Sequence, residues 1–368
     1  MELNIDELKK VGIIAQKQRD YYLFRLGTVA GELSADQLNS ITVIAVKYAD
    51  GKVHLTTRQG VEIHNIHESS LKEVSEELEI SGITLGVCGP RGRGIVACPG
   101  NATCTSGLIE TKELAAELDA LYYRKDAPHK FKIGISGCAN NCSKPVENDV
   151  GVMGGVLPGW EKDKCINCKL CLNICPTQTL KYIEDQYVLD QDKCILCGLC
   201  ISNCPGNAWE ARKSGYTLYL GGTMGKKPRL GTKAKVLIES KDELLRYIKR
   251  AFEFYFNNGR KKERFGHTLD RIGVDKVLAE IFAEDKQTVD LRGVSCPMNF
   301  AKAKVAMEEL AEEKRIEFYL DEGEPLVNVT RSLKNEGYSV VNVTQEERYF
   351  RVLVEKSTAN NIQPVGAL

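Results

Sequence analysis

The sequence has no uninterrupted apolar run approaching the ~20 residues that a membrane-spanning helix needs. Its first ten residues, MELNIDELKK, are charged and lack the apolar region of a signal peptide. It also has no excess of one charge, since 50 Lys and Arg balance 50 Asp and Glu. These absences argue against a membrane span, secretion and binding to nucleic acid or membranes through overall charge. Any basic site must therefore be local, and we expect a cytoplasmic protein.

A nucleotide-binding motif is also missing. The glycine-rich segment 86–94, GVCGPRGRG, has neither the spacing nor the strand–loop–helix context of a dinucleotide fingerprint. A loop that presents Arg91 and Arg93 to anionic groups fits this segment better, because guanidinium groups suit carboxylates and oxyanions.

Cysteine, by contrast, is abundant, with 14 residues in a chain of 368. Twelve of them stand in spacings typical of metal ligands, and Cys88 and Cys296 are the other two. Without a signal peptide, this pattern indicates reduced thiolates rather than disulfides. We expect Cys88, which matches no ligand spacing, to be a buried structural thiol.

Eight cysteines form a tandem run in segment 161–206. The pattern C-x2-C-x2-C-x3-C-P occurs twice, which is the bacterial ferredoxin run for two [4Fe–4S] clusters. In such runs the fourth cysteine ligates the other cluster. The predicted ligand sets are Cys165, Cys168, Cys171 and Cys204 for one cluster, and Cys194, Cys197, Cys200 and Cys175 for the other. Zinc is an implausible alternative for a full tandem run, and we predict a relay for single electrons.

The remaining four cysteines lie in the segments CPGNATC and CANNC, at Cys98, Cys104, Cys138 and Cys142. Four thiolates can close one cubane cluster, and the surrounding glycine, proline and asparagine let the backbone turn tightly around it. Zinc, which usually has shorter spacings, and buried structural cysteines are the alternatives. The run HKFK favours a cluster, because Lys130 and Lys132 would lie on one face of a strand and two such cations need a resident anion.

These spacings resemble the sirohaem sulfite and nitrite reductases, whose pattern is C-x5-C followed by C-x3-C. The resemblance implies that the four cysteines hold a [4Fe–4S] cluster and that Cys142 bridges to the sirohaem iron. It implies catalytic roles toward a bound oxyanion for Arg58 in the motif TTRQ, for Arg93, and for Lys130 and Lys132. Without it, Arg58 would be an exposed turn arginine. The cofactor-binding residues that it implies are Arg58, Gln59, Arg91, Arg93, Asn101, Lys130, Lys132, Asn141, Cys142, Gly221 and Gly222.

The predicted fold class is α+β, with four parts. Residues 1–85 resemble the ferredoxin-like half-domain of the same family. Their pattern predicts the order β-α-β-β-α, with a capping box at Ser34 to Gln37. Residues 86–160 and 207–285 would form the reductase domain, interrupted by the inserted ferredoxin domain at 161–206. Residues 286–368 would form a separate sulfur-carrier domain.

Two segments of the reductase domain have ordinary interpretations. The segment 215–225 predicts a strand that ends in glycines, and residues 241–256 predict a helix whose aromatic residues pack in the core. The basic run 260–264, RKKER, predicts a solvated helix end or loop.

The C-terminal part resembles the TusA/SirA-like sulfur carriers, built as a β-α-β-α-β-β sandwich. Cys296 precedes Pro297 at the expected start of a helix, where the positive helix end favours a thiolate. The resemblance implies that Cys296 carries a persulfide. Its usual motif is C-P-x-P, and Asn299 stands here in place of the second proline. The alternative is a half-buried, inert thiol.

Together these features predict the six-electron reduction of sulfite to sulfide, using sirohaem and three [4Fe–4S] clusters. The Lys-x-Lys pair is the sulfite pattern of the family, whereas nitrite enzymes tend to have asparagine at the second lysine. Reduction of nitrite to ammonia, or a non-catalytic sulfur-transfer or electron-relay protein, are the alternatives. Electrons would come from an external ferredoxin or flavoprotein. Only one copy of the half-domain and cluster unit is present, so we expect a homodimer or a pair with a related subunit.

Overall fold

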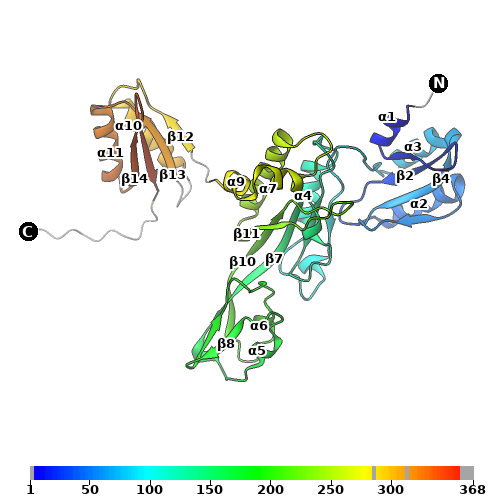
Figure 1. Cartoon of the computed structure of the whole chain (residues 1–368), viewed down its shortest axis with the longest axis horizontal. Helices are drawn as coiled ribbons and strands as arrows, with labels where there is room; N and C mark the ends of the chain where they lie inside the picture. The colour runs from blue at the N-terminus through cyan, green and yellow to red at the C-terminus, as the bar shows by residue number, and fades with distance from the viewer. Residues whose placement is uncertain (1–3, 284–286, 311–314, 357–368) are drawn as a thin grey trace, which may run out of the picture. The chain divides into compact units, whose positions relative to one another are not determined.

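The protein is described by a computed structural model that covers residues 4–283, 287–310 and 315–356 (Figure 1). It divides into two units, residues 1–282 and 283–368. The predicted boundary at 285–286 lies outside the described residues. Mixed helices and sheets in both units confirm the α+β class.

The N-terminal part of the first unit is an antiparallel sheet in the order β1-β2-β4-β3, covered by two helices. Alternate residues of its second strand, Tyr22, Phe24 and Leu26, are buried and pack against the helices. The predicted order and the capping box of Ser34 and Gln37 are confirmed, and the short elements α1 and β1 were not predicted. The elements are α1 Ile5–Lys10, β1 Ile13–Ala15, β2 Tyr21–Leu26, α2 Ala35–Tyr48, β3 Val53–Leu55, β4 Val61–His67 and α3 Leu71–Ile80.

The central sheet has the order β11-β10-β7-β6-β5, in which β5, β6 and β7 are parallel and the other pairs antiparallel. Helix α7 packs its aromatic residues into the core around the fully buried Phe131, as predicted. The strands are β5 Val96–Ala97, β6 Ile133–Ser136, β7 Val150–Trp160, β10 Trp209–Leu220 and β11 Thr232–Ile238. The helices are α4 Lys112–Tyr122, α7 Lys241–Asn258, α8 Phe265–Ile272 and α9 Val274–Ile281.

Strands β7 and β10 form a long antiparallel ribbon that leaves this sheet and carries the tandem cysteine segment at its far end (Figure 1). Trp160 pairs with Trp209 where the ribbon ends. The segment contains α5 Leu170–Ile174, β8 Leu180–Ile183, β9 Gln186–Leu189 and α6 Leu199–Ser202. A Cβ atom at Gly198, just before α6, would lie 2.7 Å from Val156 and 3.9 Å from Leu108. The segment therefore packs closely against the central domain at this point.

The second unit has a sheet in the order β12-β13-β15-β14, with β12 and β13 parallel and the rest antiparallel. Two helices pack on this sheet around a core that includes Phe318 and Leu333. The predicted order β-α-β-α-β-β is confirmed, although Pro297 is the N-cap residue rather than the first helical residue. The elements are β12 Gln287–Asp290, α10 Met298–Glu309, β13 Arg315–Leu320, α11 Glu324–Asn335, β14 Ser339–Gln345 and β15 Phe350–Glu355.

Candidate active site

Two adjacent parallel strands organise the candidate site. Strand β5 follows Arg93 and is followed by Cys98, and strand β6 follows Lys132 and precedes Cys138. The strands are in register, with Val96 opposite Gly134. Because parallel strands begin at the same edge of a sheet, the basic residues gather at one edge and the cysteines at the other.

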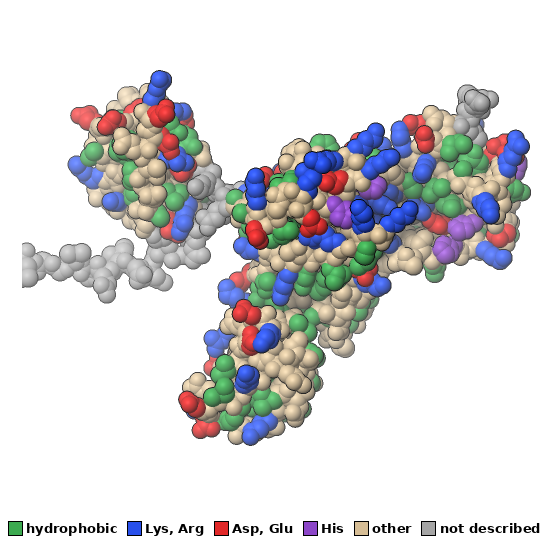
Figure 2. Space-filling model, in the orientation of Figure 1, with side chains coloured by type: hydrophobic (Ala, Val, Ile, Leu, Met, Phe, Trp, Pro, Cys, Tyr) green, Lys and Arg blue, Asp and Glu red, His purple; other side chains and the backbone are tan. Residues whose placement is uncertain are grey.

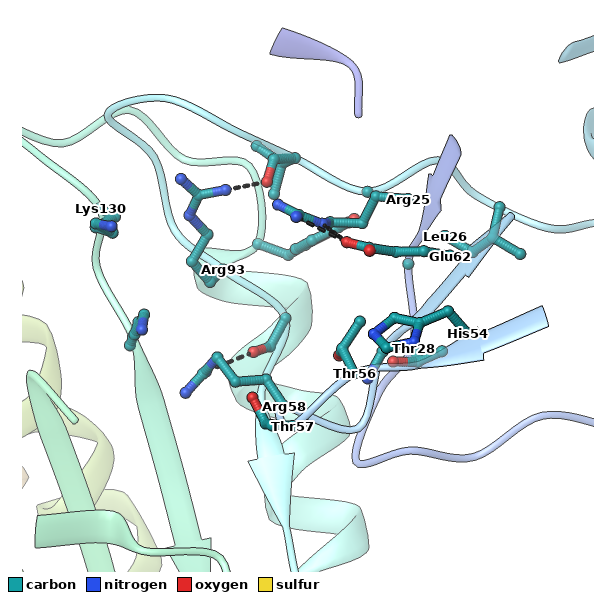
Figure 3. A pocket seen from close by; sticks show the side chains of 17 residues that line it. Arg25, Leu26, Thr28, His54, Thr56, Thr57, Arg58, Glu62, Arg93 and Lys130 are labelled. Atoms are coloured by element: carbon teal, nitrogen blue, oxygen red, sulfur yellow. Dashed lines mark hydrogen bonds and ion pairs between the residues drawn. The ribbon is translucent and has the colours of Figure 1, made fainter. Parts of the chain in front are cut away.

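The basic edge borders a cavity of about 430 Å³ between the N-terminal sheet and the central domain (Figure 3). A volume of this size is typical of a small-molecule site. We call it the basic cavity, because five of its lining side chains are cationic. It is lined by Arg25, Leu26, Gly27, Thr28, His54, Thr56, Thr57, Arg58, Gly60, Glu62, Gly86, Val87, Arg93, Gly94, Tyr123, Lys130 and Lys132. Lysine and arginine side chains also gather on the face of the first unit that Figure 2 shows.

The four basic residues predicted for the substrate all line this cavity. Arg58 donates to Asn148 Oδ1 at 2.6 Å and to the Gly94 carbonyl at 3.2 Å. Arg93 donates to the carbonyls of Val87 and Gly89, and its Nε is buried without a hydrogen-bond partner among the described residues. In Figure 3, Lys130 lies across from both guanidinium groups. Cationic side chains from both walls therefore face one cavity that an anion could enter.

Burial makes these cations easier to deprotonate. It lowers the pKa of Arg58 to about 10 and the pKa of Lys132 to about 8, and it also lowers the pKa of Lys130. The neighbouring charges of Arg58, Arg264 and Lys130 add to the effect on Lys132. An anion in the cavity would offset this repulsion, and a lysine that titrates near neutral pH can supply a proton.

The far wall of the cavity holds residues that sequence reasoning missed. Arg25 forms an ion pair with Glu62 at 2.7 Å and donates to Cys88 Sγ at 3.0 Å. His54, opposite Glu62 in the β3–β4 pairing, also lines the cavity. Arg25 alternates with buried residues on β2, so it lies on the side of the strand that faces away from the core. This alternation was the one sequence feature that could have indicated Arg25 as a cavity residue. Cys88 is buried, as predicted.

A buried ion pair behind the cavity was also missed. Arg264 binds Asp149 through two hydrogen bonds, at 3.2 and 2.6 Å, and both side chains are almost fully buried. The prediction that the basic run 260–264 is a solvated helix end or loop is therefore wrong for Arg264. The run has no apolar residue, so nothing in its composition indicates that one member enters the core.

The four cysteines at the other edge form what we call the cysteine cage: Cys98, Cys104, Cys138 and Cys142. Burial raises the pKa of the Cys138 thiol, and the nearby thiols of the other three raise it further. In the described part of the chain, no three His, Cys, Asp or Glu side chains are close enough together to hold a single metal ion. The spacing of the four thiols instead suits a cubane cluster, which is larger than one ion and is bound by more widely spaced thiolates.

Glycines allow the loops of the cysteine cage to approach one another. The Gly137 amide donates to Cys98 Sγ at 3.0 Å. A Cβ atom at Gly137 would lie 3.0 Å from the Gly100 Cα, and one at Gly107 would lie 2.5 Å from the Asn101 amide nitrogen. The Leu108 amide donates to the Gly137 carbonyl at 2.8 Å. Thiol ligands on close-packed glycine loops suit an iron–sulfur cluster.

Other predicted cofactor residues lie outside the cavity lining. Arg91 forms an ion pair with Asp126 at 2.9 Å. Gln59 exchanges two hydrogen bonds with the Ala97 backbone and so fixes β5. Gly221 and Gly222 pack against the backbone around Asn148 and Asp149.

Two predicted residues, by contrast, lie at the cysteine cage. Asn101 is exposed beside Cys104. Asn141 precedes Cys142 in the left-handed region, with its Oδ1 buried and unpaired among the described residues.

The tandem cysteines gather around two separate cavities in the inserted segment. One is lined by Cys175, Cys194, Cys197 and Cys200, and the other by Cys165, Cys168, Cys171 and Cys204. Each cavity thus takes its fourth cysteine from the other run, which is the crossed arrangement of two-cluster ferredoxins. In the second unit, Cys296 is exposed just before the N-cap of α10.

This combination of cysteine cage, basic cavity and ferredoxin-type insert defines an iron–sulfur oxidoreductase scaffold. Residues 88–289 match the nitrite and sulphite reductase 4Fe-4S domain, and residues 14–79 match the nitrite/sulfite reductase ferredoxin-like half domain. Residues 287–356 match the sulfurtransferase TusA. The chain belongs to the nitrite and sulphite reductase family and carries a C-terminal TusA domain.

Individual relatives agree with this family. The chain is 33% identical over 272 residues to the coenzyme F420-dependent sulfite reductase of Methanocaldococcus jannaschii, covering 73% of this chain and 43% of that protein. It is 31% identical over 200 residues to a subunit of the anaerobic sulfite reductase of Salmonella typhimurium, covering 48% of this chain and 56% of that protein. It thus spans about half the length of these two relatives.

A crystal structure of dissimilatory sulfite reductase I has a similar fold, with a TM-score of 0.59 at 20% identity, covering 71% of this chain and 69% of that one. No helix among the described residues is both long and apolar enough to cross a membrane.

Proposed function

We propose that this protein reduces sulfite to sulfide in the basic cavity, with sirohaem and [4Fe–4S] clusters as cofactors. One observation carries the proposal: the same two parallel strands bear the cavity cations at one end and the cysteine cage at the other. An electron-relay protein needs a cysteine cage, but it has no use for a cavity lined by five cations.

The cofactors have plausible ligands in this chain. The cysteine cage, including Cys142, would hold one [4Fe–4S] cluster, and the two crossed cysteine sets would each hold another. The carboxylates of sirohaem suit the cations that line the cavity, including Arg25 and Arg93. When bound, these groups would supply the electrons for the reduction of sulfite.

The cavity residues would then bind and protonate the substrate. Arg58 and Arg93 are placed to hold sulfite oxygens, and their fixed positive charge stabilises negative charge as it develops. Lys130 and Lys132 can donate protons to an oxygen that leaves as water. Since the pKa of Lys132 is lowered to about 8, its ammonium form is lost above that pH, and proton supply should fall there.

Sulfite rather than nitrite is favoured by the lysine pair. Both Lys130 and Lys132 line the cavity, so two ammonium groups are available to an anion with three oxygens. Reduction of nitrite to ammonia is the second candidate, since the same cavity could hold that smaller anion.

The test is product analysis of the anaerobically purified protein, supplied with sirohaem, a reduced viologen and either anion. We expect sulfide from sulfite at a higher kcat/KM than ammonium from nitrite. Ammonium without sulfide would move the assignment to nitrite. Neither product, from protein with its full iron content, would contradict a reductase and favour a carrier.

We further propose an external ferredoxin or flavoprotein as electron donor, a cytoplasmic location, and a homodimer or higher oligomer. Cys168, one of the predicted ligands of a cluster in the insert, is exposed, which supports the transfer of electrons to that cluster from another protein. The many unpaired thiols support a reducing compartment.

We also propose that Cys296 receives sulfur from sulfite that has taken up four electrons instead of six, before sulfide forms. With four electrons and six protons, one sulfite and the Cys296 thiolate give a persulfide and three waters, so the step needs no separate oxidant. Its exposure at the start of α10 supports access by a sulfur donor. The Cys296→Ala variant is expected to make sulfide at the wild-type rate but to lose a trappable persulfide. Thiol-trapping mass spectrometry after turnover measures this, with Cys88→Ala as the matched control. Identical labelling of wild type and Cys296→Ala would contradict the proposal.

A further inference from the structure

Two adjacent residues behind the basic cavity, Asn148 and Asp149, contact both of its walls. Asn148 Oδ1 accepts the hydrogen bond from Arg58, which comes from the N-terminal sheet. Asp149 Oδ2 accepts the backbone N–H of Lys132 at 2.8 Å, at the entrance to β6. This dipeptide therefore sets the positions of two cavity cations that are 74 residues apart in the sequence.

Asp149 is itself firmly held. Its side chain is fully buried, and Arg264, just before α8, donates a hydrogen bond to each of its carboxylate oxygens. Its backbone carbonyl accepts the Gly221 amide at 2.7 Å, and the Val150 amide bonds to the Lys132 carbonyl at 3.0 Å. The carboxylate can thus shift only if α8, β6 and the end of β10 shift with it.

The charges around Lys132 are otherwise positive. Arg58 from the loop after β3, Arg264 from the start of α8 and Lys130 all disfavour its ammonium form, and Asp149 favours it. The charge of Asp149 also raises the pKa of Arg58 and of Lys130, and so favours their charged forms. Burial raises the pKa of Asp149 itself, and the hydrogen bonds from Arg264 and from the Lys132 amide act against this and favour its carboxylate form.

We propose that Asp149 is a positioning residue of the basic cavity: held by Arg264, it fixes the backbone of Lys132 and supplies the counter-charge that keeps the Lys132 ammonium available. The catalytic part of this inference rests on the proposed function, because a charged Lys132 is needed only if the reaction takes a proton from it. The placement of the residue itself does not depend on which anion the cavity binds.

The test measures the titration of Lys132 directly. The holoenzyme is labelled briefly with acetic anhydride at a series of pH values, and mass spectrometry gives the acetylation of Lys132 at each. We expect Asp149→Asn to lower the apparent pKa of Lys132 by about one unit or more. Asp119→Asn is the matched control, because the half-buried Asp119 carboxylate also accepts a backbone amide, from Ile95. It should leave the titration of Lys132 unchanged.

A second, isosteric variant covers the case in which Asp149→Asn fails to fold. Asn148→Asp adds a carboxylate beside Asp149, so we expect it to raise the apparent pKa of Lys132. A folded variant of either kind with a wild-type titration would overturn the proposal, as would a shift equal to that of Asp119→Asn.

The outcome is separable from that of the proposed function, because labelling needs neither sulfite nor turnover. The pH profile of sulfite reduction is recorded alongside. If Lys132 titrates as expected while the alkaline limb of turnover stays in place, the positioning role stands and the proton-donor role of Lys132 fails.

Discussion

Replacing Lys132 with methionine is expected to lower the turnover of sulfite by roughly 10²–10³-fold, the usual effect of removing one preorganised donor from a site that stabilises developing charge. Methionine keeps an unbranched apolar stem of similar length, so the packing beside the buried Phe131 should persist. Steady-state kinetics with a reduced viologen measure the effect. The alkaline limb that we assign to the pKa of Lys132, about 8, should disappear with the side chain.

The matched control is Arg91→Ala. Arg91 comes from the same loop as Arg93, but it pairs with Asp126 and does not line the basic cavity. Surface ion pairs of this kind contribute at most about 1 kcal/mol, so turnover should stay near the wild-type value. Equal losses for Lys132→Met and Arg91→Ala would contradict the assignment of the cavity as the substrate site.

The second large effect concerns the crossed cysteine sets of the insert. Cys204→Ser should remove the same cluster as Cys165→Ser, because both residues line one cavity, whereas Cys175→Ser should remove the cluster held with Cys194. Each variant should lose about one third of the iron if every cluster has four irons, and reduction of sulfite by a protein donor should stop.

Iron analysis and low-temperature electron paramagnetic resonance of the reduced protein check this arrangement. Cys88→Ser serves as the control, since Cys88 lines neither cavity of the insert, and it should keep the full iron content. If Cys204→Ser and Cys175→Ser lost the same signal, the crossed assignment would be wrong.

The cysteine ligands predicted for the inserted segment follow from their spacing in the sequence alone. Ligand spacing in the tandem run is local, so it predicts two ligand sets, and the structure gathers those same sets around two cavities. The alternation of Lys130 and Lys132 predicts two ammonium groups on one face of a strand. Both side chains line the basic cavity, although strand β6 begins only at Ile133.

The residues that the sequence did not reveal act over long separations. Asp149 and Arg264 are 115 positions apart, and no pattern around either indicates that they pair in the core. Gln59 was expected at the cofactor through the family resemblance of the motif TTRQ; in the structure its side chain bonds to the Ala97 backbone, a contact that no local pattern indicates. Burial and pairing of this kind depend on tertiary structure, which local sequence does not contain.

The most direct test of the account is whether sulfite binds at the sirohaem through the cations of the basic cavity. Visible absorption and electron paramagnetic resonance spectra of the purified holoenzyme are titrated with sulfite, for the wild type, Lys132→Met and Arg91→Ala. The account predicts a saturable change of the sirohaem spectrum in the wild type and Arg91→Ala, with much weaker binding in Lys132→Met. A spectrum that sulfite leaves unchanged, or equal affinity in all three proteins, would contradict it.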